Sequence, residues 1–135
     1  MRILIDTNVI LDILLKREEF VSISQAALEK SINQGDMLFF SSSAVTDIYY
    51  LIRKNTGSRE KALNAIKQLA EFLTFATVDE NCIMEAMLSK ISDYEDAVVD
   101  VVASRANVDY IMTRNIEDFK NSDNNVISPM EYLTI

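Results

Sequence analysis

Short apolar runs alternate with longer amphipathic stretches along this chain, and each change of period marks a change of element. The first run, residues 1–5, is followed by the polar residues Asp6, Thr7 and Asn8, and an apolar stretch resumes at Val9. This pattern predicts a buried parallel strand that leads into a helix. Ligand sites in parallel sheets lie beyond the carboxyl ends of the strands, so Asp6 is either a helix cap or part of a site, whereas Thr7 and Asn8 are better interpreted as caps.

The remaining pattern predicts further helices and strands in alternation. The predicted helices cover residues 9–16, 20–33, a stretch from Ser42 or Ser43 through residue 54, then 60–73, 80–90 and a stretch that ends at residue 106. The predicted later strands cover residues 37–41, 74–78, 109–113 and the region around 126–127, with short turns at 115–119 and after Pro129. This order predicts a parallel, right-handed α/β sandwich.

Two helices carry patterns of their own. Residues 92–95, Ser-Asp-Tyr-Glu, have the form of a capping box that opens the helix ending at residue 106. In the preceding helix, Met84, Met87, Leu88 and Ile91 recur at spacings of three and four. That spacing predicts that these four side chains pack into the core and do not form a ligand site.

Length and composition indicate a single intracellular domain. The chain has 135 residues, and its two glycines and one proline leave no linker or repeat. The apolar runs are too short to span a bilayer and no basic leader precedes the first one, so we expect a soluble, cytoplasmic protein. Cys82 is the only cysteine, so we predict that it is a small buried apolar residue without a function of its own.

Charge and residue content exclude several kinds of catalysis. The chain contains no histidine, which excludes Ser-His-Asp and Cys-His schemes, histidine acid/base pairs and the usual zinc sites. A net charge of −8 disfavours nonspecific attraction to nucleic acid, so an anionic substrate would need cations at the site. A basic protein partner is also consistent with this charge.

Four aspartates recur at comparable places along the chain. Asp6 ends the first strand, Asp47 lies in the helix after the second, Asp96 lies one turn into the helix opened by the capping box, and Asp118 follows the strand that ends at Thr113. In a parallel α/β fold all four aspartates lie toward the carboxyl edge of the sheet, where they can converge. Oxygen ligands without nitrogen or sulfur suit Mg²⁺ or Mn²⁺.

The helical positions of these acids leave alternatives open. Asp47 falls nearly opposite the apolar face of its helix, so it is either solvated or the wall of a cleft. Asp93, Asp96 and Asp100 share one helix face, where like charges cost about 0.2 to 0.5 kcal/mol per pair and a bound cation would relieve the repulsion. Glu95 is interpreted as part of the cap and Asp100 as an exposed side chain, while Asp93 stays undecided between cap and site.

Two further polar groups have a simple and a functional interpretation. Asp12 lies four residues before Lys16 and is most simply interpreted as half of an ion pair with it on the helix surface. Thr113, Arg114 and Asn115 form either a turn at the end of a strand or a group that orients a phosphate and a metal-bound water beside Asp118.

Three motifs together resemble a known family. Residues 6–8 (Asp-Thr-Asn), 93–97 (Asp-Tyr-Glu-Asp-Ala) and 113–119 (Thr-Arg-Asn-Ile-Glu-Asp-Phe) occur in the order found in PIN-domain ribonucleases, and the chain is most similar to the short VapC-type toxins. The resemblance implies a three-layer α/β/α sandwich with a central parallel sheet. It also implies an acidic cluster that binds Mg²⁺ or Mn²⁺, cleavage of RNA, a homodimer and an antitoxin partner.

The resemblance also assigns roles to individual residues. Asp6 and Asp96 match metal ligands, and Asp118 matches the fourth acid of the family. Asp47 stands where the family more often has glutamate, so its shorter side chain makes a water-mediated role an alternative to direct contact with the metal. Thr113 and Asn115 match polar positions that orient the site, and Asn8 is a further candidate for that role.

A metal-dependent reaction is compatible with the absence of histidine. A metal lowers the pKa of a bound water, which then attacks the phosphodiester and leaves a 5′-phosphate and a 3′-hydroxyl. Two alternatives remain. One is a catalytically inactive PIN-like scaffold that binds a protein or RNA. The other is a haloacid-dehalogenase-like phosphatase. Its signature requires an acidic residue where this chain has Asn8, and it requires a catalytic lysine, for which Lys90 is the only candidate.

Overall fold

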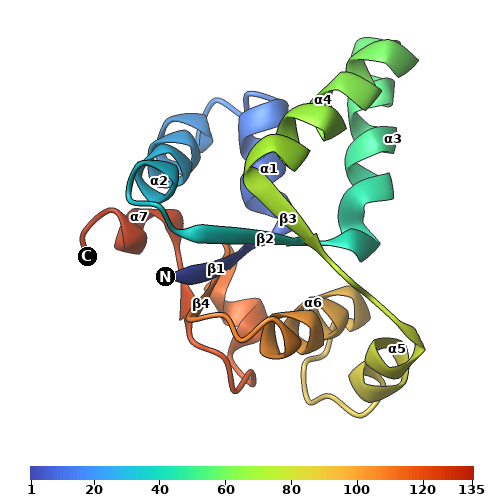
Figure 1. Ribbon diagram of the computed structural model, residues 1–135, viewed down its shortest axis with the longest axis vertical. Coiled ribbons are helices and arrows are strands. Elements are labelled where there is room, and N and C mark those ends of the chain that lie inside the picture. The colour runs from blue at the N-terminus through green and yellow to red at the C-terminus, as the bar shows by residue number, and fades with distance from the viewer.

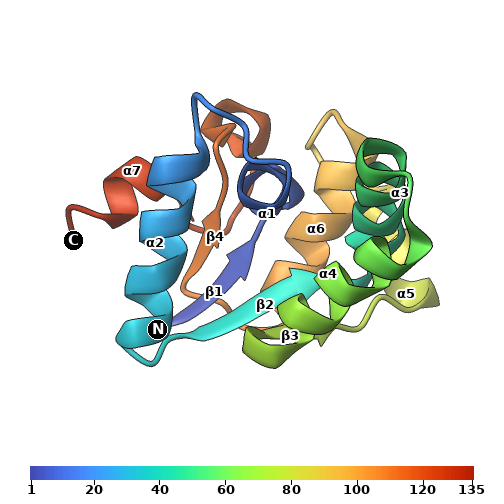
Figure 2. The ribbon, with the colours of Figure 1, turned by 90° about the horizontal axis from the view of Figure 1, so that it is seen from above.

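A five-stranded, entirely parallel sheet lies at the centre of the computed structural model, which describes residues 1–135 (Figure 1). The strand order is β3-β2-β1-β4-β5. The strands are β1 (Arg2–Ile5), β2 (Met37–Ser41), β3 (Leu73–Ala76), β4 (Tyr110–Met112) and β5 (Val126–Ile127). The first strand is thus the central one, and its carboxyl end opens directly into a helix (Figure 2).

Helices cover both faces of the sheet, as Figure 1 shows. One face carries α1 (Thr7–Leu14), α2 (Val21–Asn33), α3 (Val45–Thr56), α4 (Arg59–Phe72) and α7 (Pro129–Tyr132). The other face carries α5 (Glu80–Ala86), α6 (Tyr94–Arg105) and the short 3-10 helix η2 (Ile116–Phe119). A second 3-10 helix, η1 (Ser42–Ala44), joins β2 to α3. The predicted α/β/α sandwich is therefore confirmed.

The apolar run of the first strand follows from its central place. Ile3 and Ile5 point into the core under α1 to α4, while Leu4 points into the core under α6, and all three side chains are fully buried. Because helices cover both faces, the buried positions 3–5 are apolar, and only Arg2, at the start of the strand, is polar. The next polar residue, Asp6, therefore marks the carboxyl edge of the sheet.

The predicted packing of the α5 region is wrong in part. Ile91 is buried, but Met84, Met87 and Leu88 are exposed, with Leu88 retaining 86% of its accessible surface. The helix ends at Ala86, four residues earlier than predicted, so the assumed helical face does not continue. The small residues Cys82 and Ala86 are its buried positions, because they allow a close approach of α5 to the core.

Two helix caps also differ from the prediction. Asp6 itself caps α1, accepting a hydrogen bond from the backbone N–H of Thr7, so neither Thr7 nor Asn8 is the cap. Asp93, and not Ser92, caps α6, because its carboxylate accepts the backbone N–H of Asp96 at 3.0 Å. A carboxylate at each of these positions also interacts favourably with the positive N-terminal end of the helix dipole.

The C-terminal helix α7 is held against α2 and the start of β2 by a polar cluster. The fully buried Tyr132 donates its hydroxyl hydrogen bond to Asp36, which also accepts from the Met1 ammonium at 2.8 Å and from Gln34. Lys30 donates to the carbonyl oxygen of Tyr132 at 3.0 Å. Burial alone would raise the pKa of the Asp36 carboxyl. The hydrogen bonds from the Met1 ammonium, Tyr132 and Gln34 outweigh burial and lower that pKa below its ordinary value.

No helix of the structure has both the length and the apolar character needed to cross a membrane.

The Asp36 cluster predicts a pH-dependent contribution to stability. A carboxyl whose pKa is lower in the folded chain stabilises it above the ordinary value of 3.8 and loses this effect as the pH falls further. We expect Asp36→Asn to lower the free energy of unfolding by about 1 to 2 kcal/mol at pH 7. The difference from the wild type should shrink below about pH 4 in urea denaturation, and a pH-independent difference would contradict the assignment.

Candidate active site

The pairing of β1 with β4 brings Asp6 and Thr113 together. The last paired residues are Ile5 and Met112, and the backbone N–H of Asp6 still donates to the Met112 carbonyl at 2.9 Å. The next residues along the two strands, Asp6 and Thr113, are therefore neighbours at the carboxyl edge. The Thr113 hydroxyl donates to Asp6 Oδ2 at 2.8 Å, and both side chains are buried.

Asn8 connects the two sides of this edge. Its amide nitrogen lies 3.3 Å from Asp6 Oδ2 and 3.2 Å from Thr113 Oγ1, while its amide oxygen accepts the backbone N–H of Arg114 at 3.2 Å. The backbone N–H of Asn115 donates to Thr113 Oγ1 at 3.1 Å. Of the predicted orienting residues, Asn8 and Thr113 thus contact Asp6 directly, whereas Asn115 contributes its backbone and leaves its side chain exposed.

Asp6 retains an accessible edge although it is buried. Its side chain caps α1, accepts from Thr113 and Asn8, and the residue keeps 8% of its surface exposed. Desolvation raises the pKa of Asp6 above its ordinary value, and the hydrogen bonds from Thr113 and Thr7 oppose the rise without cancelling it. The nearby Asp118 carboxylate adds to the increase.

Asp96 completes the centre of an acidic cluster. It lies in the first turn of α6, half-buried, where desolvation followed by the charges of Asp6, Asp93, Asp118 and Glu95 raises its pKa from 3.8 to about 7. Like charges disfavour ionisation only when they are close. The structure therefore brings the predicted Asp6, Asp96 and Asp118 into one electrostatic group, with Asp118 exposed on η2.

Asp47 is both solvated and part of the wall of an open cleft, so its two predicted alternatives hold together. It lies exposed on α3 and lines an open groove of about 420 Å³ together with Thr7, Leu11 and Glu95. Desolvation raises the pKa of Glu95, and the largest contribution from a neighbouring charge is that of Asp47. Asp47 therefore joins the acidic group through Glu95, which the sequence interpretation had assigned to the helix cap alone.

The acidic group carries uncompensated charge. We define the acidic edge as the carboxylates of Asp6, Asp47, Asp93, Glu95, Asp96 and Asp118, none of which takes part in an ion pair. No three acidic side chains lie close enough together to hold one ion as they stand. The donor chemistry nevertheless fits a divalent cation, because an oxygen-only set with mutual repulsion is what Mg²⁺ or Mn²⁺ would neutralise.

The surface assignment of Asp12 is wrong. Its side chain has no exposed surface and pairs with Arg114, whose Nε lies 2.9 Å and whose Nη2 lies 3.2 Å from the carboxylate oxygens. The partner is 102 residues away, so helical spacing could not reveal it. Because this contact turns the Arg114 guanidinium toward Asp12, the guanidinium does not point to a phosphate position beside Asp118, as one alternative predicted.

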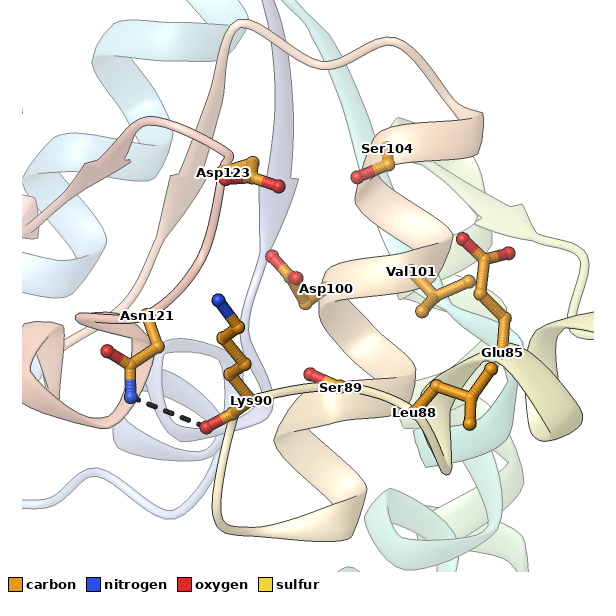
Figure 3. Close-up of a pocket in the computed structure, with 9 residues that line it drawn as sticks. All are labelled: Glu85, Leu88, Ser89, Lys90, Asp100, Val101, Ser104, Asn121 and Asp123. Carbon is orange, nitrogen blue, oxygen red and sulfur yellow. Dashed lines mark hydrogen bonds between the residues drawn. The ribbon is translucent and has the colours of Figure 1, made fainter.

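Asp100 is not merely exposed either. Its carboxylate accepts hydrogen bonds from Ser122 and, at 2.9 Å, from Asn124, which fasten the loop before β5 to α6. Figure 3 shows Asp100 in a separate polar pocket of about 360 Å³ that Lys90 and Asp123 also line. This pocket holds none of the residues of the acidic edge, so it is distinct from the candidate site.

Comparisons with known proteins bear on the family and the fold. A family model described as PIN domain matches residues 2–117. A comparison with curated proteins finds no match.

Solved structures with the same fold include three complexes. VapBC2 from Rickettsia felis bound to a promoter DNA fragment has a TM-score of 0.75 and 15% identity, covering 95% of this chain and 98% of that one. VapBC-1 from nontypeable Haemophilus influenzae has a TM-score of 0.68 and 18% identity, covering 96% and 98%. FitAB bound to an IR36 DNA fragment has a TM-score of 0.70 and 20% identity, covering 95% of each chain. At these identities the likeness shows the fold.

Crowding at the acidic edge predicts that removing one charge stabilises the metal-free protein. In chelator at pH 8, Asp96→Asn should raise Tm by about 2 to 5 °C, since it removes repulsion from Asp6 and Asp118 while preserving shape. Adding Mn²⁺ should then stabilise the wild type more than the variant. Differential scanning calorimetry measures both effects, with Asp123→Asn as the control variant, because Asp123 is exposed and lies outside the acidic edge. A lower Tm of Asp96→Asn in chelator would contradict the prediction.

Proposed function

The chain belongs to the PIN-domain family, and from this premise we propose that it is an endoribonuclease that depends on Mg²⁺ or Mn²⁺ and serves as the toxin of a toxin–antitoxin pair. The observation that supports the proposal most directly is the acidic edge, where Asp6, Asp96 and Asp118 come from three separate elements and act on one another's charge. A fold gives no function by itself, so the proposal depends on this site.

The residues at the edge suit different roles. We assign Asp6 and Asp96 as the groups that would hold a divalent ion, since both are at least half-buried and lie in electrostatic contact. Asp47 and Asp118 are exposed, so they would complete a second position or orient the attacking water. When bound, the ion would supply a water of lowered pKa and would stabilise negative charge on the phosphate.

The residues around Asp6 prepare it for that role. Thr113 and Asn8 hold Oδ2 of Asp6 from one side, and the N–H of Thr7 holds Oδ1. Three donors fix the carboxylate orientation before any ligand arrives, which limits the entropy lost on binding. Hydrolysis by water in this arrangement would leave a 5′-phosphate and a 3′-hydroxyl.

The charge of the chain constrains how RNA would bind. With a net charge of −8 and an acidic edge free of ion pairs, the protein itself supplies little attraction for phosphate. A divalent ion at the edge would neutralise part of the local negative charge and give the scissile phosphate a cation to bind. Substrate binding should therefore depend on the same metal as cleavage.

The proposal predicts metal-dependent cleavage of RNA. Purified protein with Mn²⁺ or Mg²⁺ should cut an unstructured RNA internally and leave 5′-phosphate ends, which end-labelled substrates report on a sequencing gel. Asp6→Asn and Asp96→Asn should each lower the rate at least about 100-fold, because each removes a charged group proposed to hold the ion. Asp36→Asn, at the opposite edge of the sheet, serves as the control. Full activity in excess chelator would refute the metal-dependent mechanism.

A second candidate is a catalytically inactive PIN-like scaffold that binds a protein or RNA. The observation that favours it is that no three acidic side chains stand close enough to hold one ion. A scaffold of this kind would show no Mn²⁺-dependent rise in Tm, whereas an intact site would.

The toxin assignment adds protein partners to the proposal. The structures of VapBC2, VapBC-1 and FitAB are the basis for expecting an antitoxin, and a homodimer is expected from the family resemblance. Expression of the wild type should arrest growth, and expression of Asp6→Asn should not. A small protein encoded by a neighbouring gene should relieve the arrest and purify with this chain, with light scattering giving the stoichiometry. Normal growth during wild-type expression at a level where RNA cleavage is measurable would contradict the toxin role.

A further inference from the structure

Asp12 is a second buried carboxylate on the helix that begins at Asp6. Its side chain has no exposed surface, and both carboxylate oxygens accept hydrogen bonds from protein donors. Arg114 contributes Nε at 2.9 Å and Nη2 at 3.2 Å, Ser24 donates at 3.2 Å, and Arg17 lies at 3.4 Å. A two-point contact between guanidinium and carboxylate fixes the orientation of both groups.

The arginine of this pair is itself held on its other face. The guanidinium carbon of Arg114 lies 3.8 Å from the centre of the Phe20 ring, and only 25% of the side chain is exposed. Arg114 is thus fixed between Asp12 on α1 and Phe20 at the start of α2. Since Arg114 belongs to the turn that follows β4, these contacts fix the turn as well.

The turn transmits this constraint to the acidic edge. The backbone N–H of Arg114 donates to the amide oxygen of Asn8 at 3.2 Å, which sets the direction of the Asn8 amide. The opposite end of that amide then meets Asp6 Oδ2 and Thr113 Oγ1. A displacement of the Arg114 backbone would therefore disturb the Asn8 amide, which is one of the two donors to Oδ2 of Asp6, and the chain next to Thr113, which is the other.

We infer that Asp12 is a positioning residue of the candidate site: by holding Arg114 it fixes the turn after β4, and through Asn8 and Thr113 it fixes the Asp6 carboxylate. Six residues at 1.5 Å each separate Asp12 from Asp6 by about 9 Å along the helix axis, so Asp12 acts through this chain of contacts and not on a ligand of Asp6. The inference rests on the proposed function of the acidic edge.

A purely structural ion pair would serve only to fasten α2 and the turn to α1. The two roles can be separated, because replacing both partners of a buried pair by apolar residues removes the unpaired charge that a single substitution leaves behind. The double variant Asp12→Leu with Arg114→Leu should recover stability relative to Asp12→Leu alone. It should not recover the orientation of Asn8 and Asp6, since the guanidinium contact that ties the turn to α1 is then absent.

The experiment compares Asp12→Asn and the double variant with the wild type and with Asp36→Asn. The last is a matched control, because Asp36 is also a nearly buried carboxylate paired with a cation but lies at the opposite edge of the sheet. Two readouts are recorded: the side-chain amide resonances of Asn8 in metal-free protein, and the affinity for Mn²⁺ from the electron paramagnetic resonance signal of the free ion.

The expected result is that both Asp12 variants shift the Asn8 resonances, speed the exchange of that amide with water and weaken Mn²⁺ binding by about 10- to 100-fold. Asp36→Asn should leave both readouts at the wild-type level. If Asp12→Asn fails to fold, the double variant supplies both measurements.

Two outcomes would overturn the inference: Asn8 resonances that stay unchanged in a folded Asp12 variant, or resonances that move while Mn²⁺ affinity stays at the wild-type value. If the wild type binds no Mn²⁺ but the Asn8 resonances respond to Asp12, the metal-dependent function fails and the positioning role stands.

Discussion

The parallel pairing of β1 with β4 is the constraint on which the candidate site depends. Its register ends at Ile5 and Met112, so the next residues, Asp6 and Thr113, meet although 107 positions separate them. A shift of one residue would turn the Thr113 side chain to the other face of the sheet and leave the Asp6 carboxylate without its shortest side-chain donor. Both strands are buried on both faces, and the apolar packing that fixes this register also fixes the polar edge.

Helix α1 and its N-cap residue carry two buried carboxylates, Asp12 and Asp6, in opposite electrostatic situations. Asp12 is paired with Arg114, and removing one partner of such a pair typically costs about 3 to 5 kcal/mol. Asp6 has hydrogen bonds but no ion pair, and desolvation, together with the nearby Asp118 charge, raises its pKa. The paired acid therefore stabilises a fixed geometry, while the unpaired acid keeps the charge that a ligand could use. Like charges crowded at a functional site repel one another and so commonly lower the stability of the folded protein.

The elements and the strand-edge position of Asp6 could be predicted because they depend on local pattern. Residues 3–5 lie in the middle of the sheet and read as an uninterrupted apolar run. Met84, Met87 and Leu88 were misassigned because spacing identifies a face but does not say whether anything covers it. Asp12 was misassigned because its partner Arg114 lies on another element, so helix position alone suggested a surface pair. Glu95 lies in the first turn of α6 as predicted, but helix position could not reveal that the Asp47 carboxylate of α3 lies near it.

The sequence by itself determined the order of strands and helices, the absence of histidine chemistry and the acids that follow buried strands, because each is a property of a short segment. Tertiary structure decided which acids share a site and which are neutralised. Asp6, Asp96 and Asp118 become one electrostatic group, whereas Asp12 is withdrawn into an ion pair. The reason is physical: charge interactions depend on distance and burial in space, and the sequence records neither for residues a hundred positions apart.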